Sequence, residues 1–172
     1  EICKIIPDYD ALIVRSQTKV TPKIIETGRN LKIIGRAGVG LDNVNLEAAN
    51  RNGIVVMNVP GGNTISTAEL SFAMILALSR NIPQAYNSLR KGEWDRKTYK
   101  GVEIRNKTLG ILGVGRIGTE VARRARAFEM RVIAHDPYLS EEKAKQIGIE
   151  IKSFVDLLKE SDYLTIHTPL ND

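Results

Sequence analysis

Three glycines stand in the spacing G-x-G-x-x-G within "LGILGVGRIG", residues 109 to 118. In a loop that binds a dinucleotide, each position has its own use. Gly113 permits a tight turn, Gly115 lets a pyrophosphate approach the backbone, and Gly118 allows a helix to pack closely on a strand. The short pattern also arises in ordinary turns, so it predicts a dinucleotide site only where a strand precedes it and a helix follows it.

The flanking residues supply that context. "TLGIL" (108–112) is a short apolar run typical of a buried parallel strand. After the turn, apolar residues recur at positions 117, 121, 125 and 128, which is one stripe of a helix. "MRVIAHD" (130–136) then predicts a second strand. The glycine pattern therefore lies on a strand-to-helix turn inside a β-α-β unit.

An acid closes this unit. Asp136 lies 18 residues beyond Gly118, close to the ~20 expected for the acid that binds the adenosine ribose. An ionised Asp only accepts hydrogen bonds, so it suits a ribose hydroxyl and repels a 2′-phosphate. The next residues, Pro137, Tyr138 and Leu139, bring no cation. The sequence therefore predicts that the loop binds NAD and prefers it to NADP.

A second glycine-rich turn, "GRAGVG" (35–40), also follows a predicted strand and precedes a predicted helix. It lacks the G-x-G-x-x-G spacing, and no acid follows at the required distance. With Arg36 beside it, the turn could direct backbone N–H groups at an anion. A plain structural turn with a surface arginine explains these residues equally well.

The elements that must position both turns repeat a β-α rhythm, which predicts an α/β fold with a doubly wound parallel sheet. Strands are predicted at 9–16, 31–38, 53–60, 108–112, 130–136, 149–151 and 163–169. Helices are predicted at 21–30, 45–53, 67–80, 82–94, 140–148 and 153–162, and after the glycine turn. "STAE" (66–69) has the pattern of a capping box opening the helix 67–80, whose apolar residues occupy nearly every face. The Pro/Gly/Asn-rich loop 58–64 marks a boundary between domains at 1–60 and 61–172.

Composition excludes several classes of protein. The 172 residues carry a net charge of +5 but only 5% aromatics, and the basic residues are dispersed, so no nucleic-acid partner is expected. The apolar runs are too short to span a bilayer, so no membrane association is expected. Cys3, the single cysteine, excludes an internal disulfide or a cysteine zinc cluster and fits the cytoplasm. No metal is expected, and the two ends read as cuts in a longer protein.

A wider set of motifs identifies a family. "YDALIVRSQTKVT", "IIGRAGVGLDNVNLEAANRNGIVVMNVPGGNTISTAEL", "RNIPQAYNSLRKGEWDR", "LGILGVGRIG" and "HTPLND" together resemble the D-isomer-specific 2-hydroxyacid dehydrogenases. The resemblance implies a Rossmann NAD-binding domain inserted in a flavodoxin-like substrate domain. Residues 1–60 resemble part of the substrate domain, and residues 61–172 resemble the first part of the NAD domain with its dimerisation helices. "VRSQTKVT" and "KGEWDR" favour a member that acts on 3-phosphoglycerate.

The resemblance also assigns site residues. The expected cofactor contacts are Val39, Gly113, Gly115, Arg116, Ile117, Gly118, Asp136 and Thr168. The expected substrate contacts are Arg15, Arg36 and Gly38. The family's catalytic Arg, Glu and His are expected downstream of Asp172, so no catalytic residue is assigned in this chain. His135 and His167 are expected to have structural roles.

Three functions remain open at this point. The first is oxidation of 3-phosphoglycerate by an NAD-dependent enzyme that forms a homodimer or a tetramer of dimers. The second is another D-2-hydroxyacid dehydrogenase, of the D-lactate or glyoxylate/hydroxypyruvate type. The third is an NAD-binding interaction module resembling a transcriptional corepressor. The fold alone does not separate them.

Overall fold

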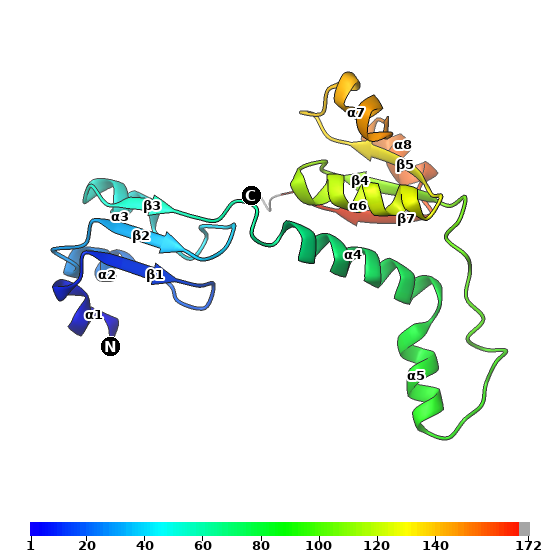
Figure 1. The fold of residues 1–172 in the computed structure, drawn as a ribbon, viewed down its shortest axis with the longest axis horizontal. Helices are drawn as coiled ribbons and strands as arrows, with labels where there is room; N and C mark the ends of the chain where they lie inside the picture. Colours follow the sequence, from blue (N-terminus) through cyan, green and yellow to red (C-terminus); the bar gives the residue numbers. More distant parts are fainter. Residues whose placement is uncertain (169–172) are drawn as a thin grey trace. The chain divides into compact units, whose positions relative to one another are not determined.

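The computed structural model describes residues 1–168, and the chain divides into two compact units, Glu1–Asn63 and Thr64–Asp172. Each unit is built around its own parallel sheet (Figure 1). The α/β fold with parallel sheets is therefore confirmed. Among the described residues, no helix has both the length and the apolar character needed to cross a membrane.

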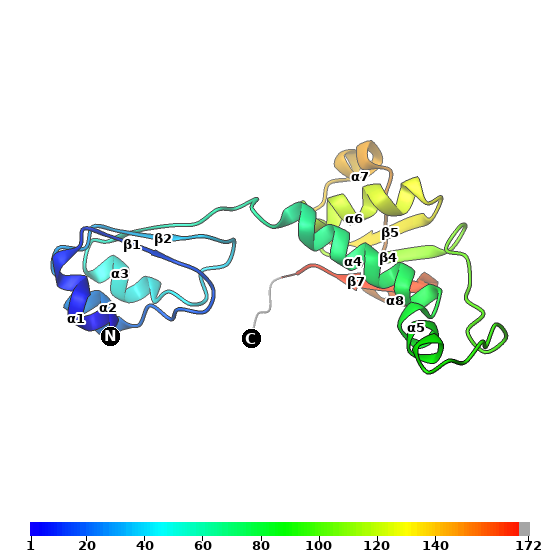
Figure 2. The same cartoon turned by 60° about the horizontal axis from the view of Figure 1, so that its bottom comes forward.

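The first unit has three parallel strands in the order β1 (Ala11–Val14), β2 (Ile33–Arg36) and β3 (Val55–Met57). The helices α1 (Ile2–Ile5), α2 (Pro22–Thr27) and α3 (Leu46–Arg51) lie along one face of this sheet, as Figure 2 shows, and η1 (Ile6–Asp8) connects α1 to β1. Their apolar side chains close a core with the inward residues of the strands. The buried residues of this core are Ile6, Val14, Val20, Ile24, Ile25, Leu31, Ile34, Val44, Ala48, Ala49 and Ile54.

The second unit has four parallel strands in the order β6 (Glu150–Ile151), β5 (Arg131–His135), β4 (Thr108–Leu112) and β7 (Tyr163–Ile166). Numbered within this unit, the order is 3-2-1-4, the arrangement of dinucleotide-binding sheets. The connections reverse direction between β4 and β7. A ligand of such a sheet binds outside the carboxyl ends of the strands at this reversal.

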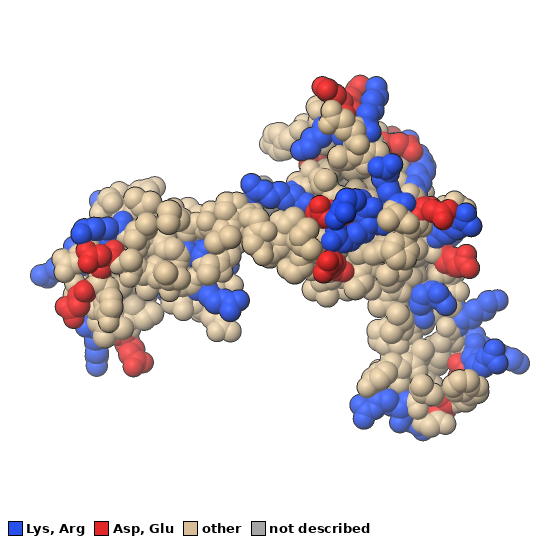
Figure 3. Space-filling model, in the orientation of Figure 1, with Lys and Arg blue, Asp and Glu red and all other residues tan. Residues whose placement is uncertain are grey.

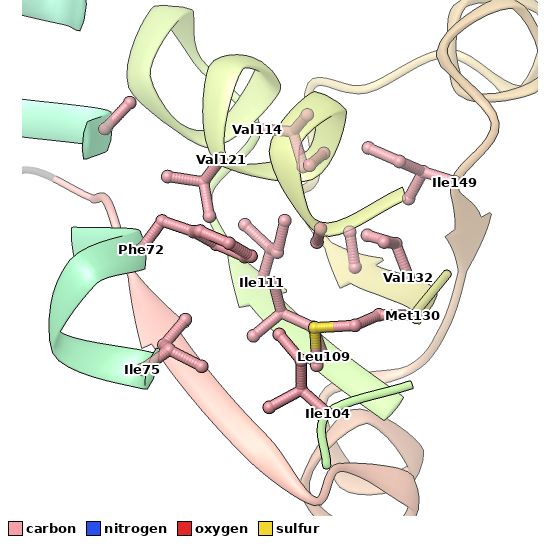
Figure 4. Close-up of a cluster of buried hydrophobic side chains, with 14 residues drawn as sticks. Phe72, Ile75, Ile104, Leu109, Ile111, Val114, Val121, Met130, Val132 and Ile149 are labelled. Atoms are coloured by element: carbon pink, nitrogen blue, oxygen red, sulfur yellow. The ribbon is translucent and has the colours of Figure 1, made fainter. Parts of the chain in front are cut away.

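Two helices cover opposite faces of this sheet. Successive residues of a strand point to opposite faces, and β4 shows the consequence. Ile111 packs toward α6 (Arg116–Ala127), whereas a Cβ at Gly110 would lie 3.2 Å from Leu157 of α8 (Phe154–Glu160). Figure 4 shows the cluster on the α6 side, where Phe72 and Ile75 of α4 (Thr64–Ser79) meet Ile111 and Val121.

Helix boundaries follow local sequence in most places. Asn45, Ser140 and Ser153 cap α3, α7 (Glu141–Ile147) and α8, each accepting a hydrogen bond from the backbone N–H three residues later. The helix after the domain boundary differs from its prediction. It begins at Thr64, so Ser66 lies inside it and does not act as the N-cap. The Pro60-Gly61-Gly62 stretch ends the preceding loop, and helix-compatible residues follow it at once.

The remaining long feature is an arm. Helix α5 (Ile82–Arg90) follows α4 and leads into an irregular connector at 91–107. Figure 3 shows basic side chains over α6 and along this arm, with acidic side chains among them. Several are paired, including Arg124 with Glu120 at 2.6 Å and Arg131 with Glu150 at 2.6 Å. Much of the positive charge in the second unit is therefore locally compensated.

Candidate cofactor and anion sites

The glycine turn of the second unit joins the carboxyl end of β4 to the start of α6. Gly113 has φ +89°, a conformation that other residues rarely adopt. A Cβ there would lie 2.9 Å from Cγ2 of Thr168, so the turn also lies against the end of β7. The turn therefore stands at the reversal of the sheet, where a dinucleotide is expected to bind.

The other two glycines of the turn differ in their surroundings. A Cβ at Gly118 would meet the Gly113 carbonyl, so the helix can approach the turn only without a side chain there. A Cβ at Gly115 would meet nothing within 4 Å, so the protein itself does not require glycine at this position. Gly115 is the N-cap of α6, and the first N–H groups of that helix can receive a phosphate. The turn thus fits a dinucleotide pyrophosphate.

Asp136 follows β5 and is bonded to the glycine turn itself. Its Oδ2 accepts a hydrogen bond from the Val114 N–H at 2.7 Å, and its Oδ1 accepts one from the Tyr138 N–H at 2.8 Å. A carboxylate offers about four acceptor directions, so two remain for ribose hydroxyls. The contact with Val114 is a second function that sequence reasoning missed, because it joins residues 22 apart.

The remaining predicted cofactor residues lie around the same turn. Arg116 is exposed at the first position of α6, and Ile117 is half-buried against the core beside it. Thr168 lies against Gly113. The cofactor contacts assigned to these residues stay predictions.

The two histidines of the chain contact their own unit. Nδ1 of His135 is 3.0 Å from the Lys152 carbonyl oxygen. Nε2 of His167 is 3.0 Å from the Thr165 hydroxyl, and partial burial lowers the pKa of the ring. Both contacts lie within the second unit, and the structural roles of the two histidines stay predictions.

In the first unit, Arg15 and Arg36 lie at the carboxyl ends of two neighbouring strands. Arg36 is the last residue of β2. Its register partner on β1 is Val14, the residue directly before Arg15. The guanidinium donates to the Ser16 hydroxyl at 3.3 Å and lies beside Gly38. Nε of Arg36 is buried, and no acceptor for it exists among the described residues. An unpaired guanidinium N–H next to a glycine turn is suited to an anion.

Two asparagines that the sequence analysis did not single out hold the loops at this edge. The Asn43 side-chain amide donates to the carbonyls of Arg15, at 2.9 Å, and Thr18, at 2.7 Å. The Asn58 side-chain amide donates to the Val39 carbonyl at 2.6 Å. Asparagine in a loop is common, and the sequence carries no signal for a partner 19 to 28 residues away.

A large apolar surface lies along α4. Leu70, Met74 and Leu78 recur every four residues and are 63%, 63% and 68% exposed. The apolar character continues on α5 with Ile82, Tyr86 and Leu89. A groove of about 510 Å³ runs between α4 and β7, lined by Ser71, Met74, Ile75, Leu78 and residues 162–165. Exposed apolar surface of this extent is typical of a protein interface.

Comparison with known proteins places this geometry among relatives. A sequence profile described as D-isomer specific 2-hydroxyacid dehydrogenase, NAD binding domain, matches residues 72–172. D-3-phosphoglycerate dehydrogenase from Archaeoglobus fulgidus is 53% identical over 98% of this chain, which covers 32% of that protein. The enzyme of the same name from Bacillus subtilis is 54% identical over 94% of this chain, covering 31% of that protein. The chain thus spans about a third of the length of these relatives.

Solved structures agree with the fold. TT0316 protein from Thermus thermophilus matches with a TM-score of 0.91 and 34% identity, over 99% of this chain and 54% of that one. D-lactate dehydrogenase from Aquifex aeolicus, complexed with NAD and lactic acid, matches with a TM-score of 0.87 and 30% identity, over 98% of this chain and 51% of that one.

Proposed function

The chain belongs to the D-isomer-specific 2-hydroxyacid dehydrogenase family and contains its NAD-binding domain, and from this premise we propose that it serves the oxidation of 3-phosphoglycerate to 3-phosphohydroxypyruvate, a step toward serine. Identity of about one half to D-3-phosphoglycerate dehydrogenases over nearly the whole chain carries this proposal. When bound, NAD would accept the hydride from the 2-carbon of the substrate, and the hydroxyl proton would pass to a base.

We assign the second unit to the cofactor. The N–H groups in the first turn of α6 would hold the pyrophosphate above Gly115, where open space receives it. Asp136 would accept from the adenosine ribose hydroxyls while fixing the turn through the Val114 N–H. The carboxylate also disfavours a 2′-phosphate at this position, which supports NAD over NADP.

We assign the first unit to the substrate. Arg36 and the turn after it would bind the substrate carboxylate, because the guanidinium and the backbone N–H groups lie at one edge of the sheet. Arg15, exposed directly after β1, is the candidate for the substrate phosphate. Both charges would anchor an anionic substrate through charge-assisted hydrogen bonds.

We further propose that two copies associate through the apolar surface of α4. One copy leaves Leu70, Met74 and Leu78 more than half exposed, and a twofold dimer would cover them.

We also propose a cytoplasmic location, which accords with the free thiol of Cys3.

A second candidate function is a related dehydrogenase acting on a smaller 2-hydroxy acid. The structural match to D-lactate dehydrogenase from Aquifex aeolicus supports this second candidate.

The experiment that tests the two candidates measures NADH formed by the full-length protein from 3-phosphoglycerate, D-glycerate and D-lactate. We expect the highest kcat/KM for 3-phosphoglycerate, because only this substrate can use Arg15 for a phosphate. A higher kcat/KM for D-lactate would favour the second candidate, and NAD binding without turnover of any substrate would favour a corepressor-like module.

A further inference from the structure

The turn after β2 is fixed by two neighbouring donors from the segment after β3. The Val59 N–H donates to the Gly38 carbonyl at 2.9 Å. The Asn58 side-chain amide donates to the Val39 carbonyl at 2.6 Å. Two successive carbonyls of the turn are therefore drawn toward residues 58 and 59.

This arrangement determines where the N–H groups of the turn point. The chain has no cis peptide bond among its described residues, and in a trans peptide the C=O and the following N–H point in opposite directions. The N–H groups of Val39 and Gly40 are therefore directed away from residues 58 and 59. Among the described residues, neither N–H has an acceptor.

The charged neighbours of these two N–H groups are Arg36 and Asp42. The Arg36 guanidinium lies beside Gly38, with its Cζ 2.8 Å from where a Cβ would stand. Oδ1 of Asp42 is 2.7 Å from the equivalent point on Gly40. One cation and one carboxylate flank the turn, so their charges offset each other and give no strong net attraction for an anion. Attraction of an anion therefore depends on the direction of the N–H groups.

We propose that Asn58 is a positioning residue for the substrate carboxylate. Its side-chain amide donates a hydrogen bond to the Val39 carbonyl and fixes the orientation of the peptide between Val39 and Gly40. In this orientation the Gly40 N–H points toward the anion. The inference rests on the proposed function, because the anion it concerns is the carboxylate of a 2-hydroxy acid. Without the Asn58 amide, the peptide between Val39 and Gly40 is free to rotate and the N–H loses its direction.

The test uses two variants of the full-length protein, Asn58→Ala and Asn58→Leu. Both remove the donor, and Leu keeps a similar volume. Calorimetry on the protein saturated with NAD measures the Kd of D-glycerate, and steady-state kinetics measures KM and kcat with whichever 2-hydroxy acid the protein oxidises. We expect Kd and KM to rise about tenfold or more in both variants, with kcat changing less, because a contact made equally before and during reaction is lost.

Asn52→Ala is the matched control. The Asn52 side-chain amide also donates to a backbone carbonyl, that of Ala48 at 2.8 Å, but at the end of α3. A merely structural role for Asn58 would lower the amount of active protein and the apparent kcat while leaving KM unchanged. That result, or a KM within twofold of the unaltered protein, would overturn the proposal. A protein that oxidises no 2-hydroxy acid but still loses D-glycerate affinity in both variants would reject the proposed function and retain the role of Asn58.

Discussion

At the residue scale, Gly115 separates folding from ligand binding. Open space surrounds its missing Cβ, and its backbone has φ −76° and ψ −157° at the N-cap of α6. Serine is a favoured residue at an N-cap. We expect Gly115→Ser to change the free energy of unfolding by less than ~1 kcal/mol, yet to weaken NAD about tenfold or more, because its side chain occupies the space of the pyrophosphate. Calorimetry and thermal unfolding measure the two effects.

Gly61→Ser is the control for this prediction. A Cβ at Gly61 also meets nothing within 4 Å, and Gly61 lies outside the glycine turn of residues 113–118. NAD affinity should be unchanged in the control. An unchanged NAD affinity in Gly115→Ser would contradict the assignment of the pyrophosphate to this turn.

Asp136 is proposed to bind the cofactor ribose and also bonds to the glycine turn, so its variant should show two effects. Asp136→Ala removes an acceptor for ribose and leaves the buried Val114 N–H without its partner. We expect NAD to bind about tenfold or more weakly, the gap between NAD and NADP to narrow, and stability to fall by ~1–3 kcal/mol. Titration of both cofactors and denaturant unfolding measure these effects.

Asp95→Ala separates the two effects of the Asp136 variant. Asp95 also accepts from two backbone N–H groups, those of Lys97 and Thr98, each at 3.0 Å, but in the connector. Its variant should leave both cofactor affinities unchanged. Equal affinity of the unaltered protein for NAD and NADP would mean that Asp136 does not select the cofactor.

At the element scale, the sequence predicted features that depend on neighbouring residues. The caps at Asn45, Ser140 and Ser153 depend on local sequence alone, because each bond spans three residues. The β-α-β unit was predictable because strand, turn and helix follow one another directly. Two hydrogen bonds were not predictable, that of Asn58 with Val39 and that of Asp136 with Val114. Each joins residues that are distant in sequence and are brought together only when the strands pair. The early start of α4 was missed because a capping pattern also occurs inside helices.

Helix α4 provides a test of association. Met74 lies in the middle of the exposed row between Leu70 and Leu78 and also lines the groove beside β7. Met74→Lys would place an unpaired charge in a buried interface, so we expect the dimer dissociation constant to rise about a hundredfold or more. Light scattering over a range of concentrations measures the mass.

Gln146→Lys, at an exposed position of α7, is the control and should remain dimeric. A monomeric mass for the unaltered protein at micromolar concentration would refute the proposed interface. An unchanged dimer in Met74→Lys would place the interface elsewhere.

At the scale of the whole molecule, we propose that the described residues bind both ligands and that neither histidine among them is the base of the reaction. His135 is bonded to the Lys152 carbonyl, and His167 to Thr165. Oxidation of a 2-hydroxy acid requires a base for the hydroxyl proton, and such a group contributes about 10²–10⁴-fold to the rate. We therefore expect the 172-residue chain to bind NAD in calorimetry and to form no NADH from 3-phosphoglycerate, whereas the full-length protein does both. Steady NADH formation by the short chain would contradict this expectation. His167→Gln would then decide whether His167 is the base, since a structural histidine would leave that rate within a few fold.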